Sequence, residues 1–494
     1  MVKILRPWKT IEIFYDARFG NLLAPSSELP HTSCSMLPSI FKSYDIRGLA
    51  PEEIDVVGAR RVAESLVHVY APKHVVVGHD MRKTSVELEA AVVEGFISRG
   101  VSVTRIGLCS TPLFYFAVGE GLTRYDLGVM VTASHNPAQY NGFKLVKGDC
   151  QPIGQGSGME ELRDVACGEL LFPSAKQRGE IFEDFEGKTR YLDRVFCAAK
   201  LPNEMPTCGV AIDAGNGMNG FLLPDFVSRL PSLVFYPLFW DLDGTFPNHE
   251  ANPLNLGTLI DLQRTVTEER CAFGVAFDGD GDRVGFVDEK GDVIPGDILT
   301  ALFAQTLLSE HPGAKILYDL RSSWSVAEVI KEGGGVPIMS RVGHAHIKRQ
   351  MRVEGALFAG ELSMHFYFAD FWYAESSDFA VLLLLKILAR SPVPLSAVWR
   401  PLQRYVHSGE INFSVKDASA VLRALGEAYG AKASQRSTID GLRFEFRDAS
   451  APKSDWWFSV RSSNTEPVVR VNLEARTVEE MERRRAEVVA VLTS

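Results

Sequence analysis

From Phe41 onward, short apolar runs rich in β-branched residues alternate with helix-length stretches, and this alternation limits the possible folds more than any other feature. Residues 52–69 carry apolar side chains at helical spacing, and a second helix is predicted over 85–99. Each helix is followed by a strand-like run, at 73–78 and at 101–106. Strand–helix–strand units of this kind build parallel, doubly wound sheets. The pattern therefore predicts α/β domains.

The same pattern recurs later in the chain, with predicted strands at 209–213 and 314–319 and a helix near 324–331. We therefore expect three α/β units, with seams near residues 183, 293 and 404. The C-terminal part differs, because its strand-like segments alternate in polarity like antiparallel strands and have helices around them. The segments are strands at 408–415, 442–446 and 456–460 and helices at 418–428 and 478–492. They predict a small α+β domain.

Bulk properties exclude several classes of protein. The chain has 494 residues, enough for about three to five domains, and a net charge of −10, which argues against a nucleic-acid partner. Seven cysteines form no C-x-x-C pair and indicate reduced thiols. No apolar run reaches the length of a membrane span, and residues 1–35 lack a signal-peptide core. We expect a cytoplasmic protein without a membrane partner, and residues 1–35, which show no clear period, as a mobile extension.

The segment 131–137, Val-Thr-Ala-Ser-His-Asn-Pro, follows a predicted strand at 127–131. A serine beside a histidine after a strand has the arrangement of a nucleophile next to a base, here Ser134 and His135. The segment contains no G-x-S-x-G elbow, and a Ser/Asn/Pro turn is the plain structural alternative. On its own, the segment does not decide between the two.

The segment 277–283, Phe-Asp-Gly-Asp-Gly-Asp-Arg, carries three carboxylates at alternate positions separated by glycines. These carboxylates are Asp278, Asp280 and Asp282. They are suited to converge on one hard divalent cation. The alternatives are a solvated acidic turn and an EF-hand loop. Arg283 stands at the sixth loop position, where an EF-hand requires glycine, and the flanks at 272–277 and 284–287 are strand-like. An Asp-rich loop beside an arginine favours a metal that handles phosphoryl oxygens.

Two further segments carry polar groups that suit a sugar phosphate. In 360–365, Glu361 and Ser363 are two residues apart and would face one pocket in an extended loop, where they could bind sugar hydroxyls. In 461–465, Arg461 with several hydroxyls and an amide is typical of a phosphate clamp. The alternatives are a surface loop and an arginine that pairs with a nearby acid such as Glu466.

In this order and at these separations, the four segments resemble the α-D-phosphohexomutase superfamily, and the segment 360–365 is most similar to its phosphomannomutase/phosphoglucomutase group. The chain departs from the family at Leu362, at Met364, and at Arg321, where the family often carries lysine. The extension 1–35 is foreign to the family. Supporting stretches also match, at 41–48, 78–82, 141–144, 243–247 and 342–344.

The resemblance implies an enzyme that interconverts hexose 1-phosphate and hexose 6-phosphate, of mannose and/or glucose, through a phosphoserine and a hexose 1,6-bisphosphate. It implies four domains around a central cleft, three α/β mixed-sheet domains and a C-terminal α+β domain. They are 36–183 with the phosphoserine loop, 184–292 with the metal loop, 293–404 with the sugar-binding loop and 405–494 with the phosphate-binding loop.

The implied site residues fall into three groups. The catalytic group is Ser134, His135, Lys144 and Arg283. The group that holds Mg²⁺ is Ser134, Asp278, Asp280 and Asp282. The substrate-binding group is Tyr44, Arg47, Arg321, His344, Glu361, Ser363, His365, Arg461, Ser463, Asn464 and Thr465. We expect small-molecule sugar phosphates as partners, glucose 1,6-bisphosphate or mannose 1,6-bisphosphate as activator, and a monomer or homodimer.

Three alternatives stay open at this point. A phosphoglucosamine mutase usually carries glutamine or serine where Leu362 stands. An inactive binding or scaffold relative of the same fold would carry no phosphate on Ser134. A phosphatase would have to admit water to the phosphoserine.

Overall fold

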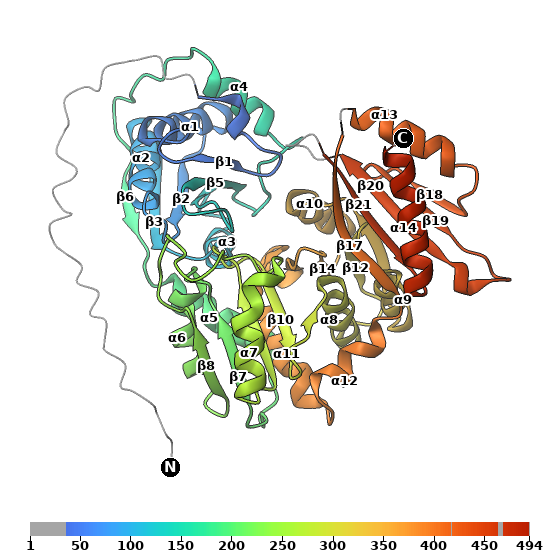
Figure 1. Cartoon of the computed structure of the whole chain (residues 1–494). Coiled ribbons are helices and arrows are strands. Elements are labelled where there is room, and N and C mark those ends of the chain that lie inside the picture. Colours follow the sequence, from blue (N-terminus) through green and yellow to red (C-terminus); the bar gives the residue numbers. More distant parts are fainter. Residues whose placement is uncertain (1–35, 416, 463–467, 494) are drawn as a thin grey trace. The chain divides into compact units, whose positions relative to one another are not determined.

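The computed structural model describes residues 36–415, 417–462 and 468–493, so the predicted extension 1–35 lies outside the described residues. Within the described residues, four sheets follow one another along the chain, each built from a consecutive stretch of sequence (Figure 1). Three of these sheets mix parallel and antiparallel strands, and the fourth is antiparallel throughout. The predicted fold class, three α/β units and a C-terminal α+β unit, is confirmed.

The first sheet places the serine segment at the end of a fully buried strand. Its order is β1 (Ile46–Leu49), β5 (Tyr140–Lys147), β4 (Leu127–Val131), β2 (His74–His79), β3 (Ser102–Leu108) and β6 (Ile181–Glu183). Its helices are α1 (Val56–Tyr70), α2 (Ser85–Ser98), α3 (Thr111–Glu120) and α4 (Met159–Cys167). Val75 and Val77 of β2 pack with α1 and α2, whereas Val76 packs with α3, so helices cover both faces of this sheet.

The first predicted helix begins later than expected. Asp55 accepts a hydrogen bond from the Gly58 N–H at 2.7 Å and caps α1, so the helix starts at Val56 and not at residue 52. The second predicted helix ends as expected, next to Gly100, whose φ is 81°.

The second sheet places the acidic segment in a hairpin. Its order is β11 (Val293–Ile294), β10 (Val284–Asp288), β9 (Phe273–Phe277), β7 (Gly209–Asp213) and β8 (Val234–Leu238). Its helices are α5 (Gly187–Ala199), α6 (Asn219–Ser228) and α7 (Ile260–Glu268), with a 3-10 turn at Leu256–Leu259. Val284 pairs with Phe277 across the antiparallel β9–β10 pair, so residues 278–283 form the turn between these strands.

The third sheet places the segment 360–365 in a hairpin of the same kind. Its order is β13 (Val336–Ser340), β12 (Lys315–Asp319), β14 (Phe358–Gly360), β15 (Phe366–Phe368) and β16 (Ala374–Glu375). Its helices are α8 (Gly296–Glu310), α9 (Trp324–Glu332), α10 (His344–Glu354), α11 (Ser377–Arg390) and α12 (Leu395–Trp399), with short turns at Ala369–Phe371 and Arg400–Leu402. Gly360 pairs with Phe366, so residues 361–365 are the turn.

The fourth sheet carries the predicted phosphate clamp at the end of a central strand. Its order is β17 (Val406–Ser414), β21 (Val468–Ala475), β20 (Trp456–Ser462), β19 (Leu442–Phe446) and β18 (Gln435–Ser437). The helices α13 (Ala418–Tyr429) and α14 (Val478–Thr493) pack with it, and a short turn lies at Pro452–Ser454. Another short turn, at Pro38–Ile40, belongs to the first domain and contacts β1. Arg461 lies near the end of β20. Ser463, Asn464 and Thr465 lie outside the described residues.

Among the described residues, no single helix is long and apolar enough to cross a membrane. The helix α11 and residues 395–402, which meet at an angle of 93°, reach such a length and apolar composition only when they are taken together. Six described cysteines are free of disulfides: Cys109, Cys150, Cys167, Cys197, Cys208 and Cys271.

Candidate active site

Ser134 lies in the loop that follows β4, and its side chain is buried against the acidic hairpin. Its Oγ is 3.2 Å from Asp278 Oδ2 and 3.2 Å from His135 Nδ1, while its backbone N–H donates to Thr132 Oγ1 at 3.0 Å. The backbone of Ser134 is left-handed, with a φ of 52°. This conformation costs a non-glycine residue about 1–3 kcal/mol and persists where surrounding contacts enforce it. The serine segment is thus a turn, with the Asn136 N–H donating to the Ala133 carbonyl at 3.0 Å, and it holds the buried Ser134 hydroxyl beside a carboxylate.

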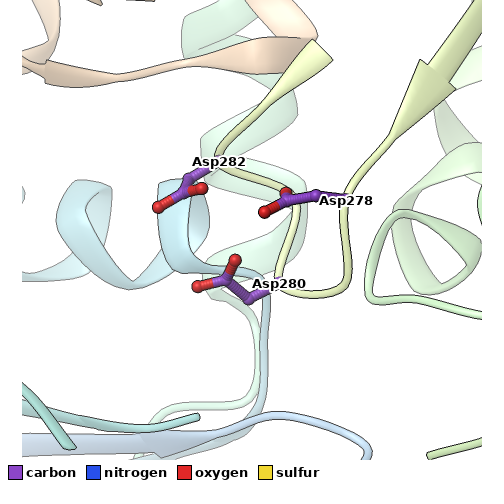
Figure 2. A group of neighbouring side chains, drawn as sticks. All are labelled: Asp278, Asp280 and Asp282. Atoms are coloured by element: carbon purple, nitrogen blue, oxygen red, sulfur yellow. The ribbon is translucent and has the colours of Figure 1, made fainter. Parts of the chain in front are cut away.

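The acidic hairpin brings three carboxylates together, as Figure 2 shows. Asp278, Asp280 and Asp282 are buried, and one oxygen from each lies within 4.8 Å of the others. The buried Oδ1 atoms of Asp280 and Asp282 have no hydrogen-bond partner. Buried oxygens without partners are rare in proteins, and clustered carboxylate oxygens are the ligands that a hard divalent cation prefers. The residues present therefore fit a metal ion, and the solvated-turn alternative is excluded by the burial.

Gly279 allows the acidic hairpin to approach the serine loop. A Cβ at this position would lie 2.5 Å from the backbone oxygen of Ser134, closer than side-chain carbons come to another atom. Any other residue would push the hairpin away from the serine. The glycine thus serves the contact between the two loops.

Lys144 of β5 contacts two of the three carboxylates. Its Nζ donates to Asp280 Oδ2 at 2.6 Å and also to Asp282 Oδ2. Burial disfavours the charged amine, but the two carboxylates outweigh burial and raise the pKa of Lys144. Thr111, at the start of α3, donates its hydroxyl to Asp280 Oδ2 at 2.6 Å. Lys144 therefore compensates part of the acidic charge as an ammonium ion.

Burial and neighbouring charges together shift the pKa values of the site residues in different directions. Burial and the neighbouring carboxylates raise the pKa of Asp278 well above its ordinary value. Against the effect of burial, Lys144 and His365 hold the pKa of Asp282 well below its ordinary value. Burial, with Arg283 and other cations, lowers the pKa of His135 well below its ordinary value. His135 is therefore a neutral imidazole near pH 7.

Arg283 joins the acidic hairpin to the 361–365 turn. Its backbone N–H donates to Asp278 Oδ1 at 3.0 Å, and its Nε lies 3.2 Å from His365 Nε2. The same His365 Nε2 is 3.3 Å from Asp282 Oδ1, though without the geometry of a hydrogen bond. Burial opposes protonation of His365, but Asp282 and Glu361 outweigh it and raise the pKa of His365 to about 9. These contacts place the two turns side by side.

Glu361 is the centre of the 361–365 turn. Its Oε1 accepts the Gly343 N–H at 3.0 Å, and its Oε2 accepts the Tyr367 hydroxyl at 2.5 Å. His365 Nδ1 lies 3.3 Å from Glu361 Oε2 and 3.0 Å from Ser363 Oγ. Glu361 and Ser363, the predicted pair in one pocket, thus both contact the imidazole of His365.

Met364 and Leu362 are the two departures from the family pattern in this turn. Met364 is buried and has a φ of 65°, so a bulky residue holds a left-handed backbone at this position. The Leu362 N–H donates to Asp319 Oδ2 at 2.9 Å. Asp319 also binds Arg321 through two hydrogen bonds, at 3.1 and 2.8 Å, so this pair braces the turn.

Arg461 forms an ion pair with an acid other than the one the sequence suggested. Its Nη2 donates to Glu410 Oε2 at 3.0 Å, whereas the acid considered from the sequence, Glu466, lies outside the described residues. Arg321 and Arg470 also approach Glu410, each at 3.5 Å. The three guanidinium groups thus converge on one carboxylate, and Arg321 also pairs with Asp319 at 2.8 Å and lies 3.9 Å from Glu361.

Tyr44, Arg47 and His344 contact segments next to these groups. The Tyr44 hydroxyl donates to the Val342 carbonyl at 3.1 Å, and its ring centroid is 5.3 Å from that of His344. Arg47 donates to Asn136 Oδ1 at 2.8 Å in the serine loop. His344 Nδ1 is buried without a partner, and burial together with Lys348 lowers the pKa of His344 well below its ordinary value.

The structure links the described predicted residues of the four loops by a chain of contacts, while Tyr44, Arg47 and His344 make the separate contacts given above. Contacts run from Ser134 through the acidic hairpin, Arg283 and His365 to Glu361, and from there through Arg321 to Arg461. Four residues of this network were missed by the sequence analysis: Thr111, Asp319, Tyr367 and Glu410. Only Asp319 carried a usable signal, since it ends a predicted parallel strand, where binding groups gather.

The chain is similar to known proteins over nearly its whole length. The four domains described as phosphoglucomutase/phosphomannomutase match in order: alpha/beta/alpha domain I over residues 38–164, domain II over 190–291, domain III over 295–405 and the C-terminal domain over 410–491. A phosphomannomutase of Salmonella montevideo is 36% identical over 461 residues, which are 92% of this chain and 99% of the relative.

Solved structures are also similar. A phosphoglucomutase/phosphomannomutase family protein from Burkholderia thailandensis has a TM-score of 0.82 at 34% identity and covers 92% of this chain and 97% of its own. A more distant N-acetylphosphoglucosamine mutase variant from Aspergillus fumigatus, solved in complex with glucose 1,6-bisphosphate, has a TM-score of 0.55 at 13% identity, covering 94% of this chain and 96% of its own. That likeness concerns the fold alone.

Proposed function

The chain belongs to the phosphoglucomutase/phosphomannomutase family and is a hexose phosphate mutase, and from this premise we propose that Ser134 carries the phosphoryl group that it moves between O1 and O6 of the hexose. The observation that carries the proposal is the position of Ser134 Oγ, 3.2 Å from Asp278 Oδ2 beside a buried group of three carboxylates. A hydroxyl held at carboxylates of this kind is suited to phosphoryl transfer assisted by a divalent cation.

Asp278, Asp280 and Asp282 are the residues that would hold Mg²⁺, together with an oxygen of phosphorylated Ser134. The unpartnered Oδ1 atoms of Asp280 and Asp282 support this assignment. When bound, the ion would neutralise negative charge on the phosphoryl oxygens. Arg283 lies at the same hairpin and would bind the reacting phosphate.

His135 and Lys144 are the groups placed for proton transfer at Ser134. His135 Nδ1 lies 3.2 Å from Ser134 Oγ, within reach of the hydroxyl proton. Lys144 Nζ donates to the carboxylates of Asp280 and Asp282 in the same hairpin. We assign to His135 the acceptance of the serine proton and to Lys144 the donation of a proton to the sugar oxygen that leaves.

The other end of the substrate binds at the remaining predicted residues. Glu361 and Ser363 would hold the sugar hydroxyls O3 and O4. Arg461 would hold the phosphate that does not react, because a guanidinium can bind two phosphate oxygens at once. The other residues of the proposed phosphate and sugar contacts are Tyr44, Arg47, Arg321, His344, His365, Ser463, Asn464 and Thr465.

A sugar 1,6-bisphosphate follows from this arrangement. Ser134 is the single proposed phosphoryl donor, so the monophosphate must accept a second phosphate, turn around, and return the first. Glucose 1,6-bisphosphate or mannose 1,6-bisphosphate would therefore act as intermediate and activator, in keeping with the glucose 1,6-bisphosphate bound by the distant Aspergillus fumigatus relative.

Mass spectrometry of the intact protein tests the proposal. Enzyme treated with glucose 1,6-bisphosphate should gain one phosphate, which peptide mapping should place on Ser134, and Ser134→Ala should gain none and lose nearly all mutase activity. A matched control is Ser363→Ala, which should still become phosphorylated. Near-normal turnover of Ser134→Ala in the presence of the bisphosphate would remove Ser134 from the mechanism.

A coupled assay decides the sugar. Mannose 1-phosphate, glucose 1-phosphate and glucosamine 1-phosphate are compared side by side, with activity on the first two expected. Preference for glucosamine 1-phosphate would favour the alternative substrate class in spite of Leu362.

A further inference from the structure

Two of the supporting sequence stretches, 78–82 and 243–247, have no part in the function proposed above. The first follows β2 in the first sheet, and the second follows β8 in the second sheet. In the structure they meet. A Cβ at Gly244 would lie 2.7 Å from the Arg82 Cα, so only glycine allows the two stretches to touch at this point.

Arg82 binds the serine loop through its backbone. Its side chain has no exposed surface, and its Nη1 donates to the carbonyls of Pro137 at 2.8 Å and Tyr140 at 3.0 Å. Its Nη2 donates to the carbonyls of Ser134 at 2.8 Å and Asn136 at 2.6 Å. One guanidinium group thus binds four carbonyls of the segment 134–140, which runs from the serine loop to the first residue of β5.

Of these four carbonyls, that of Pro137 also accepts the Tyr140 N–H at 3.0 Å and that of Tyr140 belongs to β5, whereas those of Ser134 and Asn136 lie in the serine loop itself. Buried carbonyls without partners are costly, so the loop needs an internal donor of the right shape. A guanidinium offers several N–H groups in a rigid plane, whereas an ammonium offers three from one point. The left-handed backbone of Ser134 is one of the conformations that this donor holds in place.

Arg82 is itself fixed from two sides. Asp80, whose side chain is fully buried, lies 3.2 Å from Arg82 Nε, and its Oδ1 accepts the Arg82 N–H at 3.0 Å. From the second domain, the ring of Phe246 covers the guanidinium at 5.1 Å from the ring centroid. Phe246 also approaches Gly279 of the acidic hairpin, since a Cβ there would lie 3.5 Å from its ring.

We propose that Arg82 is a positioning residue for phosphoryl transfer, which holds the serine loop so that Ser134 Oγ stays at the acidic hairpin, and that Phe246 locks the guanidinium from the second domain. This inference rests on the proposed role of Ser134. Arg82 touches neither the substrate groups nor the carboxylates assigned to the metal; it acts through the backbone of residues 134–140.

Arg82→Lys and Phe246→Leu test the proposal in the full chain. Misplacing a reacting group by about 1 Å can cost about 10²-fold in rate, so Arg82→Lys should lower kcat by about 10²-fold while KM changes less than about threefold. Phe246→Leu keeps every carbonyl contact and removes only the ring over the cation, so it should lower kcat by about 3–30-fold with KM again unchanged.

The direct readout is the rate at which dephosphorylated enzyme takes up phosphate from glucose 1,6-bisphosphate, followed by mass spectrometry. This rate should fall in parallel with kcat in both variants. The control is Arg105→Lys, because Arg105 of β3 in the same sheet forms an ion pair with the buried Glu89 of α2 at 2.7 Å. It should leave the uptake rate unchanged.

Three outcomes would overturn the proposal: an uptake rate in Arg82→Lys within about threefold of wild type, a loss no larger than that of Arg105→Lys, or a rise in KM at constant kcat. If Arg82→Lys fails to fold, Phe246→Leu decides alone, and an unchanged uptake rate there refutes the inference. Failure of the Ser134 assignment is distinguishable, because wild-type enzyme would then take up no phosphate at residue 134.

Discussion

Replacing Lys348 with methionine removes one half of an ion pair that is fully buried in the third domain. Lys348 of α10 lies with its Nζ 2.6 Å from Glu375 Oε2, and the two side chains are 0% and 1% exposed. The same Nζ is 3.8 Å from the ring centroid of Tyr115. Glu375 of β16 pairs with Tyr367 of β15, whose hydroxyl binds Glu361. The ion pair therefore lies directly behind the proposed sugar-binding turn.

The cost follows from what remains after the substitution. Methionine fills most of the lysine volume, so the main loss is the carboxylate of Glu375, which is left buried without a counter-charge. Removing one partner of a buried pair costs about 3–5 kcal/mol, whereas replacing both partners is often close to neutral. Burial outweighs Glu375 and lowers the pKa of Lys348, so the ammonium itself is poorly stabilised in this site. The double variant Lys348→Met/Glu375→Gln should therefore regain most of the loss.

Native-state hydrogen exchange measures the effect locally, since a protein of four domains need not unfold in one step. The amides of α10 and β15 should lose about 3–5 kcal/mol of protection in Lys348→Met and far less in the double variant. The control is Lys386→Met in the same domain. Its partner Glu310 is 30% exposed and also pairs with Arg390, so about 1 kcal/mol or less is expected.

A loss below about 1 kcal/mol in Lys348→Met would refute the reasoning, because it would mean that Glu375 is neutral or hydrated in the folded protein. A double variant as unstable as the single one would refute it too. In that case the loss would come from packing against Tyr115 and not from the stranded carboxylate.

Three further predictions concern the site and its surroundings. Asp280→Asn should abolish mutase activity and Mg²⁺ dependence together, since it removes one of three ligand carboxylates; full activity after EDTA treatment would contradict the metal assignment. Arg461→Ala should lower kcat/KM by about 10²–10³-fold, Arg461→Lys should recover part of it, and Ser134 should still accept phosphate in both, whereas unchanged kinetic constants would exclude the clamp. Burial outweighs the hydrogen bonds of Asp378 and raises its pKa to about 6 from an ordinary 3.8. The folded state then binds more protons across this window, so the thermal midpoint of wild type relative to Asp378→Asn should fall as pH rises from about 4 to 6, and parallel midpoints would contradict the shift.

Much of the scaffold could be predicted because the signals are local. The strand expected at 209–213 coincides with β7, and the strand expected at 127–131 coincides with β4. Strand-like flanks around 278–283 correctly indicated a loop between strands rather than an EF-hand. These features depend on side chains only a few residues apart, whose polarity and branching set the backbone. For the same reason, the sequence alone indicated that Ser134 and the acidic residues follow the ends of strands.

What could not be predicted depends on partners distant in sequence. Arg461 pairs with Glu410, 51 residues away, and no local pattern distinguishes that acid from Glu466. The hydroxyl of Thr111 meets Asp280 across 169 residues. The late start of α1 has a different cause, because the side chain of Asp55 competes for the first helical N–H groups. Predicting this start required identifying Asp55, and not Glu52 or Glu53, as the residue that caps the helix.

The two ends of the network differ in the groups that they offer to a phosphate, and this difference orders the reaction. At the Ser134 end, three buried carboxylates lie beside Ser134, so a phosphate there depends on the cation that these carboxylates would hold. At the Arg461 end, Arg461, Arg321 and Arg470 all approach Glu410, so guanidinium groups are present without a metal. A sugar phosphate should therefore settle first with its phosphate at Arg461 and its free hydroxyl toward Ser134. This orientation is the one that accepts a phosphoryl group, and a bisphosphate that turns around presents the same polarity with its ends exchanged.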